Sequence, residues 1–169
     1  MVRLDTGNID WKKLIASIVI CQLVGILGSI FTAPAIPTWY ASLEKPFFVP
    51  PSWTFSVVWT ILYLLMGIAL YLIWKKGWEK RDVRTAIGIF GIQLFLNFLW
   101  SLLFFGFQSP LLGLIEIIFL WIAIVATIWL FYKISRAAGL LLIPYLIWVS
   151  FAALLNYNIF ILNPQMTDH

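Results

Sequence analysis

The chain has 169 residues, of which 63% are hydrophobic and only 11% are charged. Soluble domains are about half apolar and about a quarter charged, so this composition excludes an ordinary soluble protein and indicates an integral membrane protein. The formal charge of +4 therefore describes the loops rather than a nucleic-acid-binding surface, and we expect no nucleic-acid partner.

Five runs with few charges are each close to the ~20 residues that cross a bilayer as a helix. They predict a single integral membrane domain over residues 1–169, with an all-α bundle of five transmembrane helices. The predicted helices cover about 12–33, 52–75, 83–107, 110–134 and 137–162. A proline-rich outer loop over residues 34–51 is predicted between the first two helices.

The apolar run of the first predicted helix follows Lys12 and Lys13, as the apolar core of a signal peptide would. Its apolar run of residues 14–31 exceeds the ~7–15 of such a core, so we expect the helix to be retained. Small residues recur at every fourth position and form a ridge that lets a second helix approach closely, inside the bundle or between protomers. The ridge consists of Ser17, Cys21, Gly25, Ser29 and Ala33.

The predicted outer loop contains five of the eight prolines and an aromatic stretch at Trp39 and Tyr40. A proline-stiffened aromatic loop is typical of a lid over a binding site. It is also typical of an aromatic belt at the lipid headgroups, and both interpretations stay open. Lys45 is the only basic residue on this side of the predicted bundle, so it is the cation available to a ligand carboxylate.

Aromatic faces are predicted on the second and fifth helices, at helical spacing. They consist of Phe55, Trp59, Tyr63 and Met66, and of Tyr145, Trp148, Ala152 and Leu155. Such faces are often simple packing, and Pro144 is expected to kink the fifth helix. With the polar stripe of the third helix beneath the predicted lid, however, they suggest a cavity for a flat, largely apolar ligand.

That polar stripe consists of Gln93, Asn97 and Ser101, with Trp100 beside Asn97. Amides are costly in hydrocarbon, so the stripe faces protein or a cavity. Interhelical hydrogen bonding and ligand contact are both open. In the fourth helix, Glu116 is the only acid within a span, and both a functional and a structural role stay open for it.

Basic residues divide unevenly between the two sides of the predicted bundle. Ten of them, including Arg3, fall in the amino terminus and the second and fourth connections, and Lys45 alone falls opposite. Because Lys and Arg concentrate in cytoplasmic loops, the amino terminus is expected inside and the carboxyl terminus outside.

Conventional catalytic motifs are missing from the sequence. Its only histidine is His169, the last residue, so the Ser/His and Cys/His arrangements and the metal site of a zinc protease are not available. We expect no metal and no required cofactor.

The order and spacing of several short motifs resemble the translocator protein family, also called the tryptophan-rich sensory proteins or peripheral-type benzodiazepine receptors. The match runs from about Trp39 to Asn163, and the ten tryptophans fit the family name. Its motifs are Trp39-Tyr40-x-x-Leu43-x-Lys45-Pro46, Pro50-Pro51-x-Trp53, Val58-Trp59-x-x-Leu62-Tyr63, Gln93-Leu94-x-x-Asn97-x-x-Trp100, Phe104-Phe105-Gly106, Pro144-Tyr145-Leu146-x-Trp148 and Leu155-Asn156.

The resemblance implies a five-helix membrane protein, a homodimer, whose outer pocket binds porphyrins, related tetrapyrroles and similar flat apolar ligands. It also implies that Trp59 and Trp148 are candidate catalytic residues for light-dependent porphyrin breakdown. With the residue patterns above, the predicted ligand-binding set is Trp39, Tyr40, Pro50, Pro51, Trp53, Trp59, Tyr63, Gln93, Asn97, Trp100, Tyr145, Trp148, Ala152 and Leu155.

Three hypotheses follow: a porphyrin receptor or sensor, a transporter of tetrapyrroles or other apolar metabolites, and a structural partner of other membrane proteins. The sequence shows no inverted repeat of the kind found in many transporters. After Leu155 and Tyr157 no basic residue completes the sterol motif of the animal proteins, and such motifs are weak. The expected location is therefore a prokaryotic plasma membrane.

Overall fold

The computed structural model describes residues 9–167, so Arg3 and His169 lie outside the described residues. The described chain is helical throughout, with short connections. Its elements are α1 (Trp11–Ala35), η1 (Ile36–Tyr40), α2 (Ser52–Trp74), α3 (Arg81–Ser101), η2 (Leu102–Gly106), α4 (Pro110–Ile134), α5 (Arg136–Leu141), α6 (Ile143–Leu162) and η3 (Pro164–Thr167). Five segments are long and apolar enough to cross a bilayer: Trp11–Tyr40, Ser52–Trp74, Arg81–Gly106, Pro110–Ile134 and Arg136–Leu162. The predicted five-helix architecture is confirmed.

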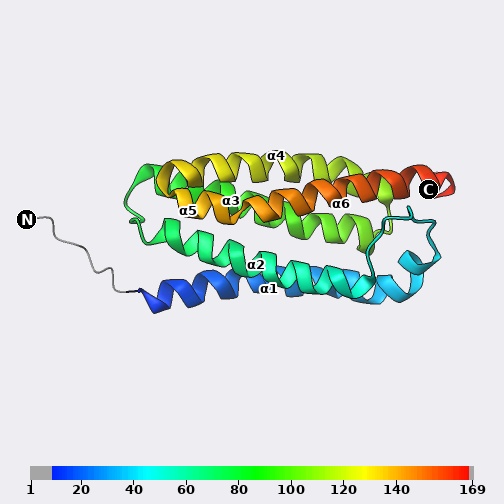
Figure 1. Ribbon diagram of the computed structural model, residues 1–169, viewed down its shortest axis with the longest axis horizontal. Helices are drawn as coiled ribbons and strands as arrows, with labels where there is room; N and C mark the ends of the chain where they lie inside the picture. The colour runs from blue at the N-terminus through cyan, green and yellow to red at the C-terminus, as the bar shows by residue number, and fades with distance from the viewer. Residues whose placement is uncertain (1–8, 168–169) are drawn as a thin grey trace, which may run out of the picture.

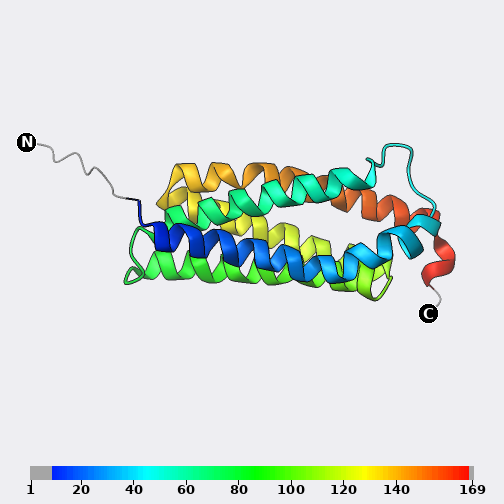
Figure 2. The ribbon, with the colours of Figure 1, turned by 90° about the horizontal axis from the view of Figure 1, so that it is seen from below.

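The five segments lie side by side along one long axis, and successive segments run in opposite directions (Figures 1 and 2). One end, called here the basic end, holds the start of α1, the α2–α3 turn and the α4–α5 junction. The other, called the loop end, holds the connection from η1 to α2. The described basic residues divide as expected: Lys45 lies at the loop end, and the basic end carries Lys12, Lys13, Lys75, Lys76, Lys80, Arg81, Arg84, Lys133 and Arg136.

The first membrane segment is longer than predicted, so the predicted loop 34–51 begins too early. Pro34 lies inside α1, and Pro37 lies inside the π-helical turn η1. Helical backbone continues to Ser42, and the connection proper covers residues 43–51. A proline removes one backbone donor, and a π-turn, which shifts the hydrogen-bond pattern to residues five apart, can accommodate that change. The Thr38 hydroxyl donates to the Pro34 carbonyl oxygen at 2.8 Å.

The fifth membrane segment is interrupted where a kink was expected. Leu142 separates α5 from α6, and Pro144 occupies the first turn of α6, where its missing N–H is tolerated. The interruption lies in the part of the segment nearer the basic end, and Tyr145 lies in the first turn of α6.

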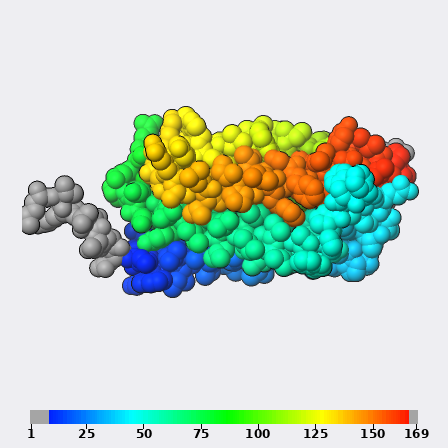
Figure 3. Space-filling model, in the orientation of Figure 1, coloured from blue at the N-terminus to red at the C-terminus, as the bar shows by residue number. Residues whose placement is uncertain are grey.

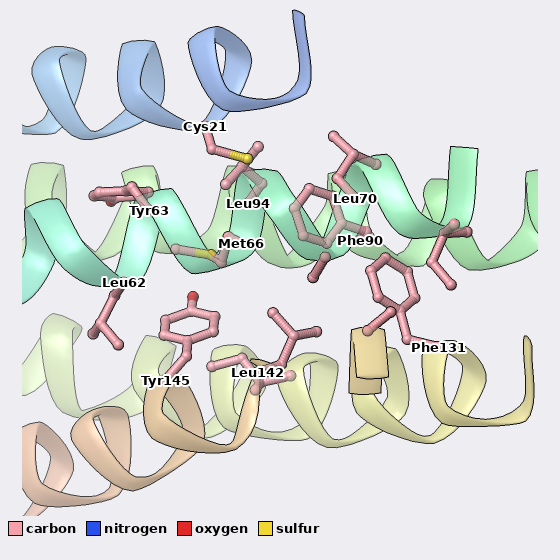
Figure 4. Close-up of a cluster of buried hydrophobic side chains, with 14 of the residues drawn as sticks. Cys21, Leu62, Tyr63, Met66, Leu70, Phe90, Leu94, Phe131, Leu142 and Tyr145 are labelled. Atoms are coloured by element: carbon pink, nitrogen blue, oxygen red, sulfur yellow. The ribbon is translucent and has the colours of Figure 1, made fainter. Parts of the chain in front are cut away.

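The core lies along the axis between α2, α3, α4 and the α5–α6 segment, where large apolar side chains are fully buried. Figure 4 shows Met66, Phe90 and Phe131 in this cluster, with Tyr145 entering from α6. Helix α1 packs against α2 and contributes Cys21 to the cluster. Their backbones approach closely at Gly67, where a Cβ atom would lie 2.6 Å from the Cα atom of Ile18.

Candidate ligand-binding site

A cavity of about 310 Å³ lies in the loop half of the bundle, between α1, α2, α3 and α6. Its volume falls at the lower end of the ~300–1,000 Å³ usual for small-molecule sites. Each surrounding helix contributes to the wall: Gln22, Gly25, Ile26, Gly28, Ser29, Thr32, Ile36 and Tyr40 from the first segment, Ser52, Phe55, Ser56, Trp59, Thr60 and Tyr63 from α2, Asn97, Trp100, Ser101, Phe104 and Phe105 from the third segment, and Trp148, Ala152, Leu155, Asn156 and Ile159 from α6.

Eight of the 24 residues that line the cavity are aromatic, and their rings pack against one another. Trp59 packs on Tyr63 with ring centroids 5.5 Å apart, and Phe55 packs edge-on against Trp148 at 5.8 Å. Opposite them, Trp100 stacks on Phe104 at 5.0 Å with an interplanar angle of 15°. Such contacts add about 0.5–1.5 kcal/mol each beyond burial, so the rings form a preorganised apolar surface.

A hydrogen-bonded network closes the cavity toward the basic end. The Tyr63 hydroxyl donates to Asn97 Oδ1, and Asn97 Nδ2 donates to the Tyr145 hydroxyl at 2.9 Å. That hydroxyl donates in turn to Gln93 Oε1 at 2.9 Å, and Gln93 Nε2 reaches the sulfur of Met66 at 3.9 Å. Beyond this floor the packed core fills the bundle (Figure 4).

Asn156 fixes the position of Trp100 in the cavity wall. The indole Nε1 of Trp100 donates to Asn156 Oδ1 at 3.2 Å, while Asn156 Nδ2 donates to the Pro110 carbonyl oxygen at 2.7 Å. The amide therefore joins α3, α4 and α6 at one point. Gly113 provides the room, because a Cβ there would lie 2.9 Å from Asn156 Oδ1.

The connection over the loop end is held by two side chains. Asn163 accepts from the Glu44 N–H at 3.0 Å and donates to the Glu44 carbonyl oxygen at 2.9 Å. Lys45 Nζ donates to the carbonyl oxygens of Tyr40 at 2.7 Å and Leu43 at 2.8 Å, so it caps the end of the first segment. Partial desolvation lowers the pKa of Lys45. From its position in the sequence, Lys45 was expected to be available to a ligand carboxylate. In the structure its ammonium group bonds backbone carbonyl oxygens instead.

The cavity carries no formal charge, because none of the described residues that line it is Asp, Glu, Lys or Arg. Glu116, the acid inside the fourth span, is buried elsewhere, and its carboxyl oxygens find no hydrogen-bond partner among the described residues. In the same described part of the chain, no cluster of three or more potential metal ligands occurs. The chemistry that the wall offers is ring stacking with a few neutral polar groups.

Eight of the predicted ligand-binding residues line the cavity: Tyr40, Trp59, Tyr63, Asn97, Trp100, Trp148, Ala152 and Leu155. Gln93 and Tyr145 lie below them in the floor network, so the polar stripe of α3 divides between interhelical bonding at Gln93 and the cavity wall at Asn97 and Ser101.

Four predicted residues lie outside the wall. Trp39 packs behind it, with its ring 5.5 Å from that of Phe104. Pro50 and Pro51 lead the connection into α2, and the Trp53 side chain is 68% exposed. The prolines shape the chain and the tryptophan faces outward, so none of the three shares the cavity.

The contribution of α1 to the wall was not predicted. The ridge of small residues was interpreted as an assembly surface inside the bundle or between protomers. Its members Ser17 and Cys21 are buried inside the bundle, and Gly25 and Ser29 also line the cavity. At Gly25 a Cβ atom would lie 2.5 Å from the Tyr63 ring. Gln22, a polar residue next to this ridge in an otherwise apolar helix, was the available signal.

Fold and site together define a helical membrane protein with an uncharged aromatic cavity at one end. The sequence profile of the TspO/MBR family matches residues 17–162, and the chain belongs to this family of integral membrane proteins. It is 52% identical over 152 residues to the tryptophan-rich protein TspO of Archaeoglobus fulgidus, covering 89% of this chain and 97% of that one.

More distant relatives match over nearly the same length. The tryptophan-rich sensory protein of Cereibacter sphaeroides is 31% identical, with 92% of this chain and 94% of that protein covered. The translocator protein of Bos taurus is 35% identical, with 88% of each chain covered. The names of these relatives support a membrane sensor or translocator role, and the predicted family is confirmed.

Proposed function

We propose that this protein is a membrane receptor for porphyrins and similar flat, largely apolar ligands, which it binds in the cavity at the loop end. The observation that carries the proposal is the uncharged wall of preorganised rings, with Trp59, Trp100 and Trp148 on different helices around one space. Indole rings stack well on a large planar macrocycle. No cofactor is needed for this role, and porphyrin is the ligand.

Binding is favoured over transport by the closed inner side of the cavity. The floor network and the packed core beyond it leave the cavity open only in the loop half of the described bundle. A transporter would need a second arrangement in which Tyr145 and Met66 separate. Uptake of protoporphyrin into proteoliposomes tests that alternative directly.

Trp59 and Trp148 are the proposed photochemical residues. On illumination, an excited porphyrin stacked on either ring would take one electron from the indole, giving a porphyrin radical anion and an indole radical cation. Dioxygen, which is needed for breakdown of the macrocycle, would come from solution. The homodimer and the prokaryotic plasma membrane also stay predictions.

Titration of the purified protein with protoporphyrin in the dark tests the proposal, with tryptophan quenching as the readout. We expect saturable quenching, and a dissociation constant raised at least about tenfold when Trp59 and Trp148 are both replaced by Phe, an effect of about 1.4 kcal/mol. Trp129→Phe, at an exposed position outside the cavity, is the matched control. Quenching without saturation, unchanged in the double variant, would mean partition into the micelle and would refute the proposed site.

The uncharged wall predicts how ligand charge affects affinity. Burying a carboxylate without a partner is costly, and Lys45 is already engaged by backbone carbonyl groups. We therefore expect protoporphyrin dimethyl ester to bind at least as tightly as protoporphyrin with its two free carboxylates. The two ligands share one ring system and differ in charge. Competition between them therefore measures how the carboxylate charges change the affinity. A clear preference for the free acid would show that a cation reaches the ligand.

A further inference from the structure

We propose that the ligand reaches the cavity from within the bilayer, through the seam between α1 and α2, while the connection 43–51 stays in place. The seam is called here the α1–α2 slit and is bordered by Gln22, Ile26 and Ser29 on one side and Ser52, Ser56 and Thr60 on the other. This inference rests on the proposed binding function and adds the route by which the ligand arrives.

The cavity wall is exposed to the surroundings on the side formed by α1 and α2 and not on the side formed by α3, η2 and α6. Every described lining residue that is exposed belongs to α1 or α2, namely Ile26, Ser29, Ser52, Ser56 and Thr60. The lining residues of α3, η2 and α6 are buried or half-buried. The cavity therefore opens along the α1–α2 slit, on a flank of the bundle that faces lipid when the five segments cross the bilayer.

The slit ends where the two helices come together. Gln22 Nε2 donates to the Thr60 carbonyl oxygen at 3.1 Å and bridges α1 to α2. Toward the basic end the helices then pack tightly at Gly67 and Ile18. Nearer the basic end, the Asp10 N–H donates to the Tyr71 hydroxyl at 3.2 Å and again joins α1 to α2. In the view of Figure 2 the two ribbons diverge toward the loop end. The opening thus begins near Gln22 and continues toward Ser52.

The slit is bordered by neutral groups that suit an apolar ligand in transit. The Ser29 hydroxyl donates to the carbonyl oxygen of Ile26 at 2.6 Å, and the Thr60 hydroxyl to that of Ser56 at 2.8 Å. Hydroxyl groups bonded to their own helix backbone are compatible with lipid. A planar apolar molecule dissolved in the bilayer can therefore pass through the slit without removing water from any charged side chain of the protein.

The competing entrance, through the connection 43–51, is closed by specific contacts. Asn163 holds the backbone of Glu44 on both sides, and Lys45 ties the same segment to the end of η1. Within the connection, Leu43 and Pro46 are buried. In Figure 3 this segment lies against the end of α6 with no opening visible on that face.

Ligand exchange kinetics distinguish the two routes. The full-length protein in nanodiscs would be mixed with protoporphyrin dimethyl ester, and binding and release would be followed by tryptophan quenching, with protein-free nanodiscs measuring partition. Ser56→Trp places a bulky side chain in the slit. Ile61→Trp adds a ring at an exposed position of the same helix that does not line the cavity, and is the matched control.

We expect Ser56→Trp, which narrows the slit, to slow both association and dissociation by about tenfold or more, equivalent to about 1.4 kcal/mol of added barrier. A variant that only weakened binding would instead speed dissociation. Ser29→Phe, on the opposite border, should act in the same direction. Ile61→Trp should leave both rates as they are, and so should Asn163→Ala, which frees the connection.

Faster exchange in Asn163→Ala, with no effect of Ser56→Trp or Ser29→Phe, would overturn the lateral route in favour of the connection. An absence of saturable binding in the unmodified protein would instead refute the proposed function itself. The two failures are therefore distinguishable in one set of measurements.

Discussion

At the scale of single residues, asparagine side chains join the parts of the site. Asn97 links α2 to α6 through two tyrosine hydroxyls, Asn156 links α3 to α4, and Asn163 holds the connection at the loop end. A primary amide both donates and accepts hydrogen bonds, so one side chain can satisfy two helices where water is scarce. Tryptophan supplies the surface of the cavity, and these amides hold that surface in place.

Replacement of Asn156 tests this role. Asn156→Leu removes the acceptor for Trp100 and the donor to Pro110, leaving buried polar groups unpaired at about 1–3 kcal/mol each. We expect a lower unfolding temperature and a shifted Trp100 emission. Asn158→Leu is the matched control, because within residues 9–167 the Asn158 amide bonds the Leu154 carbonyl of its own helix and no other helix. Equal effects of the two substitutions would argue against a special role for Asn156.

Gly25 offers a second test at the scale of one atom. The Cβ atom of Gly25→Ala would collide with the Tyr63 ring, which must move and strain its bond to Asn97. We expect porphyrin affinity to fall by about tenfold, or roughly 1.4 kcal/mol. Gly88→Ala adds the same atom into open space on α3 and should leave affinity unchanged. The titration described above measures both variants.

At the scale of elements, the sequence predicted the spans well and their ends less well. Long apolar runs locate α2 and α4 closely, because the bilayer fixes both length and composition. The end of the first segment was misplaced because Pro34 and Pro37 ordinarily stop a helix. Here the helix continues past Pro34 and widens into a π-turn that contains Pro37. Eight wall residues followed from face patterns and family motifs, but the part played by α1 depends on tertiary packing and was missed.

The connection 43–51 can be tested as an element. Asn163→Ala removes both hydrogen bonds to Glu44, each worth about 0.5–1.5 kcal/mol. We expect faster amide hydrogen exchange confined to the residues around Glu44, measured by mass spectrometry. The amides of α2 and α4 should exchange as before. Faster exchange spread over the whole bundle would show that Asn163 supports the fold rather than the connection.

At the scale of the whole molecule, charge distinguishes the two ends. Nine described basic residues lie at the basic end, against Lys45 at the loop end. Because basic loops stay in the cytoplasm, the cavity is expected to lie in the outer half of the membrane. The exposed apolar surface of α4, which includes Ile118, Phe119 and Ile122, suits contact with lipid.

Cysteine labelling tests this orientation. Cys21 is fully buried, so replacing it with Ala leaves a background for single cysteines at exposed positions. A membrane-impermeant maleimide should label Ser42→Cys, at the loop end, in intact cells, and Lys76→Cys, in the α2–α3 turn, only after lysis. The reverse pattern would place the cavity in the cytoplasmic half and contradict the predicted orientation.

The two π-turns at the loop end constrain how the gene can change. Ile36–Tyr40 and Leu102–Gly106 face each other, with the Tyr40 and Phe105 ring centroids 5.8 Å apart. Each turn holds one residue more than an α-helical turn would. A codon deletion in either could leave a continuous helix, but it would rotate every later side chain by about 100°. The number of residues in these two turns determines which aromatic side chains come into contact. Among relatives, substitutions in the turns are therefore expected to be more frequent than insertions or deletions of one residue.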